Sequence, residues 1–186
     1  MCVITGQAGI AFLDLYKDFE DLHVDDFSVT NSLWGLKVQE AGHVKISNGY
    51  LHCGGNAGLY YGPGDRTQVN AYYAGRFENL TIDMAGNWTQ GYAFIIFAGD
   101  SSGFRNVSGS GITITNSHQG IHVEGFNQAG VVDTSDSLIT LDKIDVQATN
   151  AGAAIMVRGF NGTMKVSNSR LYGTNASSGF RAFQTN

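Results

Sequence analysis

The chain has 186 residues, of which 42% are hydrophobic and 15% charged, and this ordinary globular balance argues against a disordered chain. The formal net charge of −5 argues against a nucleic-acid partner, because such a partner requires a basic stripe that neutralises phosphates. No apolar run approaches the roughly 20 residues of a membrane-spanning helix, so no membrane span is expected.

Glycine and asparagine are frequent, with 25 Gly and 14 Asn against a single Pro. Both residues tolerate the backbone angles of tight turns, so this composition favours many short strands joined by turns. Cys2 and Cys53 are too few for a disulfide framework and lack the spacing of metal ligands. His118 and His122 straddle a turn between predicted strands, so their spacing does not indicate a metal site. The sequence therefore indicates no metal and no other cofactor.

One sequence motif, called here the repeated phrase, recurs along the chain. It consists of an apolar residue, a polar turn that usually holds Asn or Gly, and a triplet whose first and third residues are apolar and whose second residue can be of any type. Its clearest copies are "VTNSLWGLKVQ" (Val29–Gln39) and "ITNSHQGIHVE" (Ile114–Glu124). Steps between copies vary through loop insertions, which fits strands joined by connections of unequal length. In chain order, the first apolar residues after the turn in the seven copies are Ile10, Leu36, Leu59, Ile95, Ile121, Ile155 and Phe180.

A second apolar segment precedes most copies, as in "VKISNGYL", "FENLTI" and "MKVSNSRL". Three short strands in each step, stacked on the next step, describe a parallel β-solenoid whose inward apolar residues form one continuous column. These segments resemble the coils of right-handed parallel β-helices of the pectin-lyase-like superfamily, which includes phage tailspikes. The expected fold is therefore all-β: one right-handed parallel β-helix domain over residues 1–186, with about seven coils of three strands. The copies run almost to both ends, so the chain is expected to be a slice of a longer protein, with further domains of the same parent chain beside it.

Stacked coils place equivalent residues roughly 4.8 Å apart in ladders. In the copy that contains Ile121, we expect Ile121 and Val123 to point inward and His122 and Glu124 to point outward. The ladder through His122 is predicted as Ala11, Lys37, Tyr60, Ile96, His122, Met156 and Arg181, and the ladder through Glu124 as Leu13, Gln39, Gly62, Ala98, Glu124, Arg158 and Phe183.

Glu124 and Arg158 become neighbours in this register. One interpretation is a surface ion pair of at most about 1 kcal/mol. The other makes Glu124 a catalytic acid or base and Arg158 a clamp for an acidic sugar, with His122 as a further catalytic group. Asp100 is expected roughly 8 Å from Glu124, a separation that suits an inverting glycosidase, although an Asp after Gly99 is also a common turn former.

Long connections in solenoids often line a binding groove, and aromatic faces pack against sugar rings. The connection after Pro63 brings tyrosines close to arginines in the sequence. The alternative is that these tyrosines only cover the core beneath the loop. The predicted substrate-binding residues are Arg158, Arg181, Tyr60, Tyr72, Tyr73 and Arg66.

Motifs typical of polygalacturonases and pectate lyases are absent, which disfavours a plant-cell-wall enzyme of those types. The resemblance to tailspikes implies an extracellular or virion-tail shaft, assembled as a parallel homotrimer, that binds a bacterial polysaccharide. In one form of this hypothesis the shaft also cleaves the polysaccharide. One alternative is a secreted uronan lyase or epimerase, in which Arg158 or Arg181 neutralises a substrate carboxylate and His122 or a Tyr moves the proton. The other is a non-catalytic adhesin or structural shaft.

Overall fold

The computed structural model describes residues 2–13, 19–39, 41–62, 73–85, 91–97, 104–127, 130–131, 134–148, 152–173 and 179–183. Within these ranges the chain forms strands and no helix, so no described segment is a helix with the length and hydropathy needed to cross a membrane. The strands are β1 (Cys2–Leu13), β2 (Phe19–Gln39), β3 (Ala41–Gly62), β4 (Tyr73–Asp83), β5 (Tyr92–Phe97), β6 (Phe104–Ser117), β7 (Gln119–Glu124), β8 (Phe126–Asn127), β9 (Gly130–Val131), β10 (Leu138–Asp142), β11 (Asp145–Ala148), β12 (Ile155–Arg158), β13 (Thr163–Ser167), β14 (Arg170–Gly173) and β15 (Phe180–Phe183).

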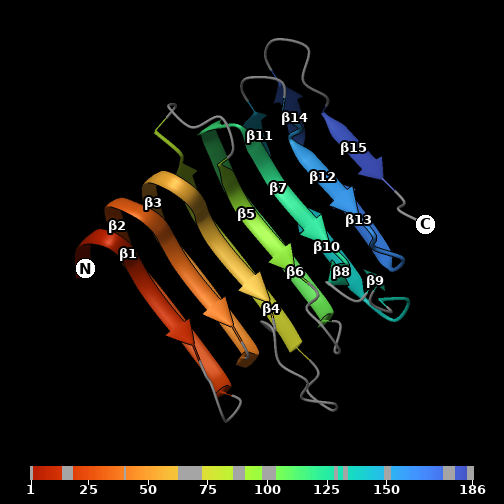
Figure 1. Ribbon diagram of the computed structural model, residues 1–186, viewed down its shortest axis with the longest axis horizontal. Helices are drawn as coiled ribbons and strands as arrows, with labels where there is room; N and C mark the ends of the chain where they lie inside the picture. The colour runs from red at the N-terminus through yellow and green to blue at the C-terminus, as the bar shows by residue number, and fades with distance from the viewer. Residues whose placement is uncertain are drawn as a thin grey trace.

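The strands form one curled sheet in which all pairings are parallel, and β8 and β9 form a separate antiparallel hairpin. Figure 1 shows β1, β2, β3, β5, β7, β12 and β15 side by side, with their arrows pointing the same way. The sheet curls because its long strands change direction. In β3, residues 43–52 pair with β4, whereas residues 57–61 pair with β5. This arrangement is consistent with the predicted β-solenoid.

The pairing registers divide the sheet into three walls that each pass of the chain crosses in order. The first wall consists of residues 19–25, 41–47, 73–78, 104–110, 138–142 and 163–167. The second wall consists of residues 2–4, 27–30, 49–52, 80–83, 112–115, 145–148 and 170–173. The third wall consists of residues 8–13, 34–39, 57–62, 92–97, 119–124, 155–158 and 180–183.

The corner between the first and second walls is built from residues in the left-handed backbone region. Asparagine and glycine adopt this region at little cost, and they occupy four of the six described positions of this corner. The Asn79 side-chain amide donates to Asn48 Oδ1 at 3.1 Å, and a Cβ at Gly111 would lie 2.9 Å from Asn79 Oδ1. The equivalent corner residues, with φ between 48° and 64°, are Asp26, Asn48, Asn79, Gly111, Lys143 and Asn168.

The inner side of the three walls encloses one apolar core, and a group of aromatic rings lies within it. Phe77, on the first wall, packs edge-on against two rings of the third wall: Tyr61 at 5.3 Å and Phe94 at 4.9 Å between ring centroids. Gly75 leaves room for these rings, because a Cβ there would lie 2.7 Å from Phe77 Cε2. The absence of a side chain at Gly75 thus provides the space that the Phe77 ring fills.

At the start of the third wall, a small residue precedes the first inward apolar residue of each described pass. A Cβ at Gly35 would lie 2.2 Å from the Gly58 carbonyl oxygen, and one at Gly120 would lie 2.3 Å from the Ala154 carbonyl oxygen. Only small residues therefore allow successive passes to approach this closely. The members of this small-residue ladder are Gly9, Gly35, Gly58, Ala93, Gly120, Ala154 and Gly179.

Candidate functional site

The outer side of the third wall carries the predicted ladders, and most of their pairings are confirmed. His122 pairs with Met156, and Glu124 pairs with Arg158, as the repeat alignment requires. The alignment was wrong by one residue in β5, where Ile95, not Ile96, lies opposite His122 and Phe97, not Ala98, lies opposite Glu124. The reason is that Ala93 occupies the small-residue ladder, so Phe94 is the first inward residue of this pass.

Glu124 is the centre of a charged cluster on this wall. Its Oε2 lies 3.0 Å from His122 Nε2, two positions earlier on the same strand, and its Oε1 lies 4.0 Å from Arg158 Nη1 on the neighbouring strand. The Glu124 side chain is 24% exposed and that of Arg158 is 39% exposed. A carboxylate held between an imidazole and a guanidinium, with access to solvent, can bind a polar ligand or exchange a proton.

His122 does not stand exposed on the outer face, as the alternation of the strand predicted, but is 2% exposed. Tyr92 covers it edge-on with 4.7 Å between ring centroids, and Gln119 Oε1 lies 3.4 Å from its Nδ1. Its ladder neighbour Met156 is also buried. His122 therefore orients Glu124 from beneath and is not itself placed to contact a large ligand.

An aromatic cluster lies on the same wall, towards the N-terminal strands. The rings of Trp34 and Phe97 each lie 6.2 Å from that of Tyr60. Lys37 Nζ lies 5.3 Å from the Trp34 ring and 5.4 Å from the Tyr60 ring, which is the geometry of a cation–π contact. Tyr60 was a predicted binding residue, whereas Trp34, Lys37 and Phe97 were not. Of these three, only Lys37 stood on a predicted ladder, the one through His122. Phe97 lies opposite Glu124 only in the register that the structure shows, and Trp34 belongs to the ladder of Gln119.

Several predicted site residues have no described side chain. Asp100, Arg66 and Tyr72 lie outside the described residues. For Tyr73 in β4 and Arg181 in β15, the structure describes the backbone of the residue but not its side chain. Arg181 pairs with Met156 as predicted, two strands from His122, while Tyr73 begins the first wall and not the third.

A second polar cluster, not predicted from the sequence, lies on the outer side of the second wall. His52 and Asp83 are neighbours in register, with 3.1 Å between His52 Nδ1 and Asp83 Oδ2. Burial raises the pKa of Asp83, but hydrogen bonds from the Asn116 amide, the Ala85 backbone N–H and His52 outweigh it, so the pKa lies below the usual value of an aspartate. Extending the repeat alignment to the second wall would have paired these two residues.

We expect the Asp83 carboxylate to stabilise the fold in a pH-dependent way. Because its folded pKa is lowered, its contribution is fully present above the unfolded pKa of about 3.9 and is lost as the pH falls through the folded pKa. Asp83→Asn should lower the free energy of unfolding near pH 7 by about 1–2 kcal/mol and flatten the loss of stability in acid. Urea titrations across this pH range measure both effects. The matched control is Asp136→Asn, at an exposed turn residue; if both variants show the same acid profile, the Asp83 contacts are not the cause.

Comparison with family models, with curated proteins and with solved structures finds no match to this chain.

Proposed function

We propose that the chain is a right-handed parallel β-helix of about seven coils, similar to those of the pectin-lyase-like superfamily, and that the outer side of its third wall binds a polysaccharide. The observation that carries the proposal is the placement of the aromatic cluster and the Glu124–Arg158 pair on one wall, one pass apart. Aromatic rings pack against the apolar faces of sugars, while charged groups beside them fix hydroxyl or carboxylate groups.

In this proposal Glu124 is the acid or base of a glycoside hydrolase. It is the only carboxylate in the described part of the third wall, and hydrolysis of a glycosidic bond usually requires two. Asp100, in the connection that follows β5, is the proposed second carboxylate. The setting proposed is an extracellular or virion-tail shaft, assembled as a trimer, that acts on a bacterial surface polysaccharide.

A uronan lyase or epimerase is the second candidate, and the contact between His122 and Glu124 beside Arg158 favours it. In that reaction the arginine would neutralise the carboxylate of the sugar, and the Glu124–His122 pair would accept the proton next to it. The product would then be an unsaturated or epimerised uronic acid rather than a hydrolysed chain.

The test is to incubate the protein with purified bacterial capsule and lipopolysaccharide glycans and to follow reducing ends and ultraviolet absorbance together. Glu124→Gln is expected to lower the rate of cleavage by about 10²–10⁴-fold, the usual contribution of a positioned acid or base. New reducing ends without absorbance support hydrolysis, and absorbance supports the lyase.

The matched control is Asp145→Asn, which removes a carboxylate that faces Arg170 at 3.5 Å on the second wall. It should leave the rate unchanged. Equal loss in both variants would reject Glu124 as the acid or base. Glycan binding without cleavage by the unchanged protein would reject catalysis and leave a binding shaft, and no binding to any glycan would reject the polysaccharide proposal itself.

A further inference from the structure

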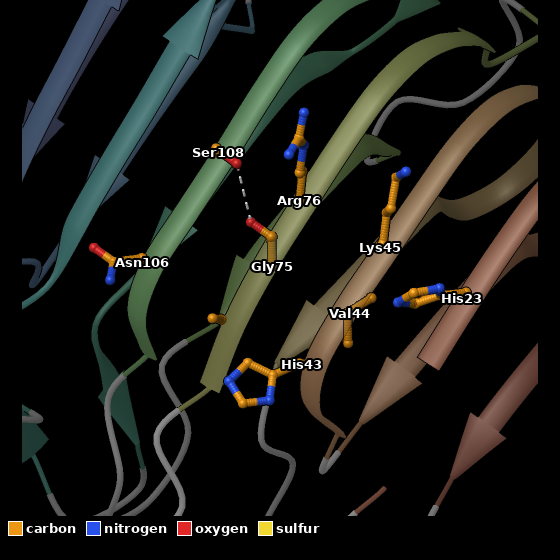
Figure 2. A pocket seen from close by; sticks show the side chains of 9 residues that line it. His23, His43, Val44, Lys45, Gly75, Arg76, Asn106 and Ser108 are labelled. Carbon is orange, nitrogen blue, oxygen red and sulfur yellow. Dashed lines mark hydrogen bonds between the residues drawn. The ribbon is translucent and has the colours of Figure 1, made fainter. Parts of the chain in front are cut away.

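The outer side of the first wall contains a hollow of about 250 Å³ that is remote in register from the Glu124 cluster. Figure 2 shows it crossing four neighbouring strands, β2, β3, β4 and β6, with basic side chains extending over its floor. Val44, Ala74 and Gly75 form part of the floor, and Asn106 and Ser108 close one side with polar groups. The residues that line it are His23, His43, Val44, Lys45, Ala74, Gly75, Arg76, Asn106 and Ser108.

Three basic residues form a ladder across this hollow. His23 pairs with Lys45, and Lys45 pairs with Arg76, so the three lie on successive strands roughly 4.8 Å apart. All three side chains are exposed. Lys45 and Arg76 carry like charges on directly opposite residues, which destabilises a sheet, and the chain has only 11 Lys and Arg residues and a net charge of −5. A bound anion would offset this repulsion, because each cation would be attracted to the anion.

The acidic residues around the hollow neutralise this ladder only in part. Glu78 Oε1 lies 2.6 Å from Arg76 Nη2, and Asp21 Oδ1 lies 3.8 Å from His43 Nδ1. Asp25 accepts hydrogen bonds of 2.7 and 2.9 Å from Ser47 and Asn48, and these bonds, together with the charge of Lys45, lower its pKa. Lys45 and His23 form no ion pair with any carboxylate among the described residues. Lys45 therefore feels the charge of Asp25 but is not held by it, and its ammonium group can reach a ligand.

We propose that the first wall is an anion-binding surface for an acidic polysaccharide, with one carboxylate or sulfate group bound at each strand of the ladder. A linear polyanion carries its charges at regular intervals, and the ladder offers cations at regular intervals along one line. Asn106 and the Ser108 hydroxyl lie where they can bind sugar hydroxyls. The lining has no Phe, Tyr or Trp on which bases could stack, and this favours a polysaccharide over a nucleic acid. The site is on a different wall from Glu124 and does not depend on catalysis there.

The experiment measures the dissociation constant of the full chain for labelled oligogalacturonate by fluorescence anisotropy, at about pH 7 and constant ionic strength. Lys45→Gln and Arg76→Gln are each expected to weaken binding about fivefold, as expected for exposed charged contacts. The matched control is Lys165→Gln, which removes an exposed lysine at the far end of the same ladder, beyond Thr140 and outside the hollow. Thermal melting of each variant confirms that it remains folded.

Binding that falls in the Lys45 and Arg76 variants, but is retained in Lys165→Gln, supports the proposal even if the third wall proves inactive. Equal weakening in Lys45→Gln and Lys165→Gln would overturn it, because the effect would then be one of net charge. If galacturonic acid or inorganic phosphate competes with the labelled ligand as effectively as the unlabelled polymer does, the proposal of a polysaccharide site is overturned, because the site then binds only a small anion. Single-stranded DNA binding more tightly than oligogalacturonate would overturn the choice of a polysaccharide.

Discussion

Replacing Phe77 by alanine is expected to lower the free energy of unfolding by about 3–5 kcal/mol. Phe77 is fully buried, and its ring joins the first wall to the third through Tyr61 and Phe94. Removal of the ring would leave a cavity next to Gly75, which has no side chain that could fill it. Denaturant unfolding followed by far-ultraviolet circular dichroism measures the change.

The matched control is Phe180→Ala, the same substitution at a phenylalanine that is 51% exposed. We expect it to change the free energy of unfolding by less than about 1 kcal/mol, because little apolar surface leaves the core. Comparable losses in the two variants would contradict the structure, since they would place the two rings in similar surroundings.

Replacing Gly58 by valine should lower the free energy of unfolding by about 1–3 kcal/mol through overpacking. A Cβ at this position would lie 2.4 Å from Ile82 Cγ2 and 2.8 Å from the Ala93 carbonyl oxygen. The second contact is with the backbone of the next pass, so a change of rotamer cannot relieve it. We therefore expect β3 and β5 to separate locally and the variant to melt at a lower temperature.

Gly54→Val is the matched control for this substitution, because Gly54 lies on the same strand and a Cβ there would meet nothing within 4 Å. It should be close to neutral in thermal melting. Gly58→Ala should fall between the two, since Ala93 and Ala154 already occupy equivalent positions of the small-residue ladder. If Gly54→Val and Gly58→Val melt at the same temperature, close packing between passes is not what limits residue size at the ladder.

The alignment of the repeated phrase predicted strand pairing well because one inward–outward pattern is compatible with one register. A slip by one residue exposes Ile121 and Val123 to water, and this cost fixes the pairing of Glu124 with Arg158. In β5 the pattern was ambiguous, because both Phe94 and Ile95 are apolar. Ala93 is small enough for the close backbone approach at the small-residue ladder, and this size, rather than hydrophobicity, decides that Phe94 points inward.

That alignment could not predict which outward side chains are buried or which polar residues come together on the first wall. An outward position predicts exposure only if no neighbour covers it, and Tyr92 covers His122 from the same wall. The hollow on the first wall was missed because His23, Lys45 and Arg76 belong to the segments that precede the repeated phrase, whose register was not extended to ladders. The proposed roles of Glu124, His122 and Arg158 stay predictions.

The pairing registers also bear on how the chain folds. In the parallel sheet of the described residues, strand partners are close in sequence: the shortest separation is 21 residues, between Ser32 and Cys53, and the longest is 35, for example between Ala57 and Tyr92. The entropy of closing a loop rises only slowly with its length, so each added pass costs nearly the same conformational entropy. Folding can therefore begin at any well-packed pass and extend to its neighbours in either direction. During synthesis, a pass can dock as soon as about 35 further residues have emerged, without waiting for the C-terminal strands.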